Sequence, residues 1–171
     1  MNQITTNEFL NSVLEAEAWK DLSQNETFTM EMLEKYSSKL DWHEVSQNSD
    51  VLWTIEGIQK FSHKIDWDAF SRNCPENLIC EAALERFADR WDWEQISGRD
   101  CFYNNWSLLE KFVDRADWSE IITNWGIDKP VEFFNKFQQY IPMAKFQNSN
   151  LWDKLVDVRS KELKNEIRGI K

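Results

Sequence analysis

Glycine and proline are scarce in this sequence. Its 171 residues include four glycines and three prolines, whereas 42% are hydrophobic and ten are tryptophan. A chain of this length and composition can bury one continuous core, and its aromatic content excludes an intrinsically disordered protein. We therefore expect one elongated folded domain.

Cysteine and histidine are also few, which narrows the possible chemistry. Cys74, Cys80 and Cys101 form no CxxC pair, and their odd number argues against a disulfide framework or a four-ligand zinc site. His43 and His63 lie in no HExxH-type spacing, and there is no glycine-rich phosphate loop. We expect no metal, no cofactor and no enzymatic activity.

Long hydrophobic runs are missing as well. The segment MNQITTNEFL at 1–10 has neither the basic nor the apolar region of a secretory signal, and no stretch approaches the length of a membrane span. The sequence predicts a soluble, cytoplasmic protein.

A tandem repeat dominates what is present. The segment LDWHEV at 40–45 returns as IDWDAF at 65–70, WDWEQI at 91–96 and ADWSEI at 116–121. The central position is held in turn by Trp19, Trp42, Trp67, Trp93, Trp118 and Met143. Six residues before each of the last five stands an aromatic residue: Tyr36, Phe61, Phe87, Phe112 and Phe137. Because the length differences fall outside this segment, it marks a structural unit with a variable loop.

Each unit is predicted to be a helical hairpin. The aspartates before the tryptophans are placed as helix N-caps. They are Asp41, Asp66, Asp92 and Asp117. Three residues further on, Glu44, Gln95 and Glu120 would complete capping boxes. A short helix, a polar turn and a longer amphipathic helix would follow. Because only the next hairpin can bury that helix, the sequence predicts an all-α solenoid of about six short-helix/long-helix hairpins of about 25 residues.

The predicted domain, 1–171, has a cap at each end. Residues 1–22 form an N-terminal half-unit that begins with a capping box from Thr5 to Glu8. Residues 23–147 hold the repeats. Residues 148–171 form a C-terminal capping helix, for which Asn150 is the predicted N-cap.

The segment 22–48, with LSQN and then TMEMLEKYSSKLDWHEVSQN, resembles the tandem WDW and LSxN helical repeat found in many copies in proteins of large DNA viruses. RWDWEQIS at 90–97 is the best single match, and the similarity covers 18–147. The resemblance implies a helical repeat array and brings no defined biochemical activity. This chain lacks the proline after LSxN and has Thr123 in place of the serine and Met143 in place of the tryptophan.

Basic residues recur at two positions of the unit, directly before the aromatic residue or three after it. They are Lys35, Lys39, Lys60, Lys64, Arg86, Arg90, Lys111, Arg115 and Lys136. Stacked hairpins would align them as a row that could bind phosphate groups. Alternatively, cations in the last helical turn favour the helix dipole and pair with acids four residues earlier, as Glu56 with Lys60 or Glu132 with Lys136. The net charge of −10 opposes a polyanion.

The tryptophans divide into two groups. Those at the central position of the repeat are predicted to fill the space between hairpins, with the indole N–H bonded locally. Four others lie outside these positions: Trp53, Trp106, Trp125 and Trp152. They either form a partner surface or pack beneath a loop.

The function favoured by the sequence is a non-catalytic protein–protein interaction module, an adaptor or inhibitor that binds another protein. The alternative is a binder of nucleic acid, or of another phosphate-bearing ligand, through the basic row.

Overall fold

The computed structural model describes residues 8–169, and no β-strand occurs in that range. The predicted all-α class is therefore confirmed. The contacts divide the chain into two compact units, Met1–Asp92 and Trp93–Lys171, and a single domain stays a prediction. The capping box at Thr5 to Glu8 lies, except for Glu8, outside the described residues.

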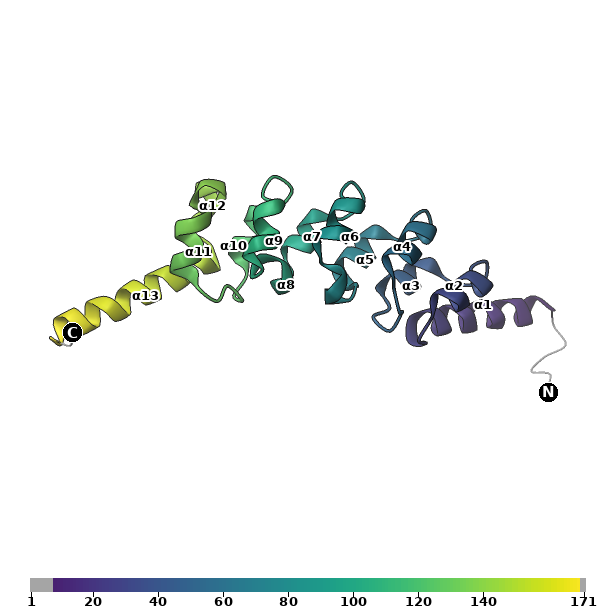
Figure 1. The fold of residues 1–171 in the computed structure, drawn as a ribbon. Coiled ribbons are helices and arrows are strands. Elements are labelled where there is room, and N and C mark those ends of the chain that lie inside the picture. Colours follow the sequence, from purple (N-terminus) through teal and green to yellow (C-terminus); the bar gives the residue numbers. More distant parts are fainter. Residues whose placement is uncertain (1–7, 170–171) are drawn as a thin grey trace. The chain divides into compact units, whose positions relative to one another are not determined.

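Each unit consists of one long helix and several short ones (Figure 1). The first contains α1 (Glu8–Asn25), α2 (Met30–Tyr36), α3 (Trp42–Gln47), α4 (Ile55–Phe61), α5 (Trp67–Asn73), the 3-10 helix η1 (Glu76–Leu78) and α6 (Glu81–Arg86). The second contains α7 (Trp93–Ser97), α8 (Asp100–Tyr103), α9 (Trp106–Lys111), α10 (Trp118–Thr123), α11 (Pro130–Phe137), the 3-10 helix η2 (Gln138–Tyr140), α12 (Met143–Phe146) and α13 (Asn150–Ile167). In the first unit α3 packs against α1 and α5, and in the second α10 packs against α7 and α13.

The core is built from the apolar positions of the repeat. The residues three after the central position are buried in the five repeats that follow Trp19: Val45, Phe70, Ile96, Ile121 and Phe146. So are those three before the aromatic residue in four units: Leu33, Ile58, Leu84 and Leu109. In α11 the half-buried Phe134 holds that position, and its neighbour Phe133 is fully buried instead.

A ring contact recurs from repeat to repeat. The tryptophan of one repeat packs against the aromatic residue of the next, with centroids 5.0 to 5.5 Å apart and ring planes 34 to 43° apart. The pairs are Trp19–Tyr36, Trp42–Phe61, Trp67–Phe87, Trp93–Phe112 and Trp118–Phe137. The indole N–H of Trp42, Trp67 and Trp118 donates to the carbonyl oxygen five residues earlier, at 2.9 to 3.0 Å. Local bonding of these indoles is therefore confirmed.

Three of the four predicted aspartate caps are confirmed, those of Asp41, Asp66 and Asp117. A side-chain oxygen of Asp41 accepts from the amides of His43 and Glu44, and that of Asp66 accepts from Ala69. Asp117 does the same for α10. The reciprocal half of the capping box was predicted wrongly, because the amide of the capping aspartate donates elsewhere.

That amide donates to a buried serine of the preceding repeat. Asp41, Asp66, Asp92 and Asp117 donate through N–H to the hydroxyl oxygens of Ser23, Ser46, Ser71 and Ser97, at 2.8 to 3.0 Å. The hydroxyls of Ser23 and Ser46 in turn donate to the carbonyls of Trp19 and Trp42. Each such serine is 0 or 1% exposed. The serine hydroxyl thus donates to a carbonyl of its own helix and accepts a hydrogen bond from the N-cap amide of the next repeat.

The buried serine is absent from the one repeat whose following N-cap residue has no N–H to donate. In the last repeat Pro142 is the N-cap residue and has no N–H to donate. The matching serine position, four after the tryptophan, is held by the buried Ile122. Thr123, predicted as the counterpart of the serine, lies one residue further on and is exposed.

The sequence predicts that the second helix of each hairpin is longer than the first, but in the structure the two are of similar length. α3 and α4 have six and seven residues, and α5 and α6 have seven and six. The second helix starts late because it has its own cap seven residues before the aromatic residue. The side chains of Thr29, Thr54 and Asn105 accept there from the amide three residues on.

Both terminal helices differ slightly from their predicted bounds. α1 continues to Asn25, three residues beyond the predicted boundary. α13 is capped by Ser149 rather than Asn150, because the buried Ser149 hydroxyl accepts from the amide of Trp152 at 3.2 Å.

Candidate interaction surfaces

The four tryptophans outside the repeat positions have different surroundings. Trp125, between α10 and α11, is 65% exposed. Trp106 is half-buried and packs against Phe133 and Phe137, with centroids 6.2 and 6.0 Å away. Trp152 is half-buried, edge-on to Phe146. Of the four, Trp125 alone has the exposure expected of a partner surface.

Trp53 packs beneath its loop, which is the second of the two alternatives that the sequence leaves open for it. It is only 7% exposed and packs against Phe70, with centroids 5.2 Å apart, because the loop between α3 and α4 turns it inward. Its neighbour Leu52 is the exposed apolar residue of that loop, at 58%. Both residues line a cavity of about 450 Å³ together with Pro75 and Asn77. Leu52 was missed because an apolar residue in a loop without period gives no signal of its direction.

Several lysines of the basic row pair with acids of the preceding repeat. The ammonium groups of Lys60 and Lys136 lie 2.7 and 2.6 Å from carboxylate oxygens of Glu34 and Glu110. That of Lys39 lies 3.0 Å from Glu15. The sequence had assigned Lys60 and Lys136 to acids within their own helices. In the structure an acid on the second helix of the preceding repeat lies beside the lysine instead.

Two lysines also cover tryptophan rings of the preceding repeat. Lys39 Nζ lies 5.2 Å from the ring centroid of Trp19, and Lys64 Nζ lies 5.3 Å from that of Trp42. Lys64 donates in addition to the Ser37 carbonyl at 3.0 Å. The side chains of Lys35, Arg86, Arg90, Lys111 and Arg115 are exposed. The contacts of Lys39, Lys60, Lys64 and Lys136 favour pairing of the basic residues with groups of the protein itself over a phosphate-binding row.

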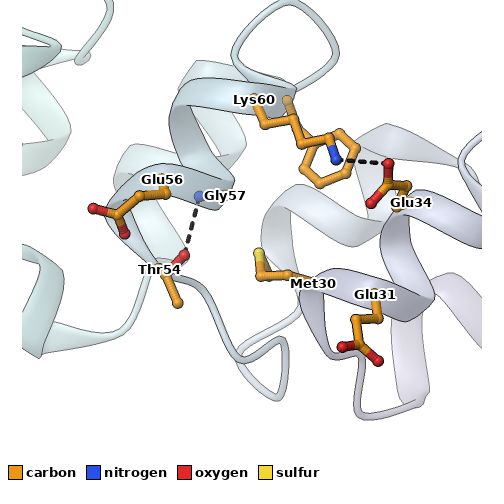
Figure 2. Close-up of a pocket in the computed structure, with 8 residues that line it drawn as sticks. Met30, Glu31, Glu34, Thr54, Glu56, Gly57 and Lys60 are labelled. Atoms are coloured by element: carbon orange, nitrogen blue, oxygen red, sulfur yellow. Dashed lines mark hydrogen bonds and ion pairs between the residues drawn. The ribbon is translucent and has the colours of Figure 1, made fainter.

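A pocket of about 200 Å³ lies between α2 and α4 (Figure 2). Its lining includes the apolar Met30 and Phe61 and the carboxylates of Glu31, Glu34 and Glu56, with Lys60 as the one cation among its lining residues. A side chain at Gly57 would meet the sulfur of Met30, so glycine lets this methionine reach α4. In Figure 2 the carboxylate of Glu34 is paired with Lys60, whereas those of Glu31 and Glu56 point away from the pocket.

An ionisable pair links α3 to the start of α5. His43 Nδ1 lies 2.7 Å from a carboxylate oxygen of Asp66. This hydrogen bond is the main cause that raises the pKa of His43 and lowers the pKa of Asp66. Both side chains are more than a third exposed, so we expect the pair to contribute less than about 1 kcal/mol.

The stability contributed by this pair depends on pH. The raised pKa of His43 gives stability that is present below the unfolded value of 6.5 and is lost as pH rises through the folded value. The lowered pKa of Asp66 gives stability that is lost as pH falls below the unfolded value of 3.8. The difference in unfolding free energy between the natural chain and His43→Gln should therefore be largest near pH 5 and small near pH 9. Urea unfolding at both values measures it, with His63→Gln as control, and a difference that is the same at both would contradict the pairing.

Comparison with family models, with curated proteins and with solved structures found no match for this sequence. Among residues 8–169, no helix combines the length and the apolar character needed to cross a membrane.

Proposed function

We propose that this chain is a non-catalytic protein–protein interaction module, an adaptor or inhibitor, built as a solenoid of about six hairpins with α1 and α13 as end caps. Two observations support the solenoid. The aspartate-capped helices pack in chain order within each unit, and the tryptophan-to-aromatic contact recurs five times. Repeat arrays of this kind present extended surfaces to partners.

The exposure of Trp125 is the main observation that supports binding of a partner. The recurring tryptophans, serines and aspartates form the bonds within and between repeats. Trp125 stands outside these positions and leaves 65% of its surface to solvent. Tryptophan is among the residues most enriched at binding hot spots, because a large rigid ring gives up little entropy on binding.

Replacement of Trp125 tests this proposal. We expect Trp125→Ala to weaken retention of the partner by about tenfold or more while the fold is unchanged. The measurement is capture of a partner on the immobilised full chain, followed by titration of the purified pair. Met143→Ala is the matched control, since Met143 is 63% exposed but lies at a repeat position. Equal affinity of Trp125→Ala and the natural chain would show that the surface around Trp125 does not bind the partner. Failure to retain any protein would contradict the proposal that the chain is an interaction module.

A further inference from the structure

Helix α13 has one face that belongs to the core of its unit. Leu151 is fully buried, and Leu155 and Val158 are half-buried on the side that packs against α10 and α11. On the same side Lys154 Nζ donates to the carbonyl of Ile127 at 2.8 Å. These contacts fix the orientation of the helix about its axis.

A second apolar stripe runs along another face of α13. Val156, Leu163 and Ile167 are 45, 41 and 85% exposed. Their spacing of seven and four residues places them on one line of an α-helix, roughly a third of a turn from the face around Leu151. The last turns of α13 extend beyond α10 to α12 (Figure 1). An exposed stripe of this kind on a helix already anchored elsewhere is typical of an interaction surface.

Charge along one edge of this stripe changes sign at the middle of the helix. Asp153 and Asp157 lie in the first half, and Lys164 and Arg168 lie at the other end, all on the same edge by helical geometry. Asp157 now pairs with Lys161 at 2.7 Å, within its own exposed helix turn. Exposed ion pairs of this kind exchange partners at little cost.

Two copies of such a helix are complementary when they run antiparallel. A two-fold axis between Ser160 and Lys161 sets Asp153 opposite Arg168 of the second copy and Asp157 opposite Lys164. The same axis sets Val156 opposite Asn165, two residues from Leu163, and therefore brings the two apolar stripes together to within one helical turn. An isologous contact requires a surface to be complementary to itself, and both the charges and the apolar residues meet this condition.

We propose that α13 binds α13 of a second copy of this chain as an antiparallel, two-fold symmetric helix pair. About this axis residues 154–167 of the two 18-residue helices overlap, over roughly 21 Å, so the interface is small and the dimer weak, with dissociation constants on the order of micromolar. α1 also exposes apolar residues, among them Phe9 and Val13. Its charges are mostly acidic, however, so α1 would repel a second α1.

The mass of the full chain in solution tests the pairing. Sedimentation velocity from about 1 to 300 µM, a range that brackets micromolar dissociation, should show the mass rising from one copy to two. Leu163→Asp places a charge in the apolar stripe and should raise the dissociation constant by about tenfold or more. Val13→Asp on α1 is the matched control and should leave it unchanged. Circular dichroism verifies that both variants keep their helices.

A charge exchange identifies the partner helix. Asp157→Lys and Lys164→Asp should each weaken the dimer, because each variant faces a second copy with like charges at this pair. A mixture of the two variants should form a heterodimer about as strong as the natural dimer, because both contacts become attractive again.

Three outcomes would overturn the proposal: a chain that stays monomeric over the whole range, a dimer unaffected by Leu163→Asp, or variants that fail to associate when mixed. A dimer abolished by Val13→Asp instead would place the contact on α1. Partner capture through Trp125 is independent of each of these results.

Discussion

Replacing Trp67 by alanine is expected to lower the free energy of unfolding by about 3–5 kcal/mol. Its ring contacts Phe70, Phe87 and Trp91, with centroids 5.8, 5.5 and 5.1 Å away. These neighbours come from its own repeat and from the next one, so alanine at this half-buried position would remove the packing of three aromatic rings between two repeats. The indole N–H bond to the carbonyl of Ser62 would also be lost.

Urea unfolding followed by circular dichroism measures this loss. Trp125→Ala is the matched control, because the same substitution at a position 65% exposed should cost less than about 0.5 kcal/mol. A loss below about 1 kcal/mol for Trp67→Ala would show that the ring is not a core residue and would undermine the repeat packing described above.

The core was predictable because it has a period. The aspartate caps and the apolar positions around Trp42 recur at fixed offsets, and helical geometry converts an offset into a face. The all-α class and the burial of residues such as Val45 and Ile58 follow from that alone.

Contacts between repeats were harder to predict, for a physical reason. Lys60 has acids both within its own helix and about 25 residues earlier, and only the packing of α2 against α4 decides in favour of Glu34. Trp53 lies in a loop without period, so its inward direction could not be read from spacing. The serine did carry a signal, because it stands four after the tryptophan in four repeats, but its role depends on a donor in the next repeat.

That serine gives the second large prediction. Ser46→Ala should lower the free energy of unfolding by about 1–3 kcal/mol, since the amide of Asp66 would lose its acceptor in a place from which water is excluded. Ser46 is 1% exposed, whereas an alanine at the exposed Ser38 should change stability by less than about 0.5 kcal/mol. A loss at Ser46 no larger than that at Ser38 would show that the bond contributes nothing to stability.

The last repeat allows the same bond to be added where it is absent. Ile122→Ser alone should destabilise strongly, because it replaces a fully buried apolar side chain with a hydroxyl that has no amide to accept from. Pro142→Asp supplies an N–H, but without the serine this amide has no acceptor. The double variant supplies both partners at the sequence spacing of Ser97 and Asp117. In that pair the amide nitrogen of Asp117 lies 2.8 Å from the hydroxyl oxygen of Ser97. The loss in free energy of unfolding in the double variant should therefore be smaller than the sum of the losses in the two single variants. We expect the difference, the coupling energy, to be about 1–2 kcal/mol. Strict additivity in urea unfolding would contradict the pairing and would leave the joint presence of Ile122 and Pro142 without a structural cause.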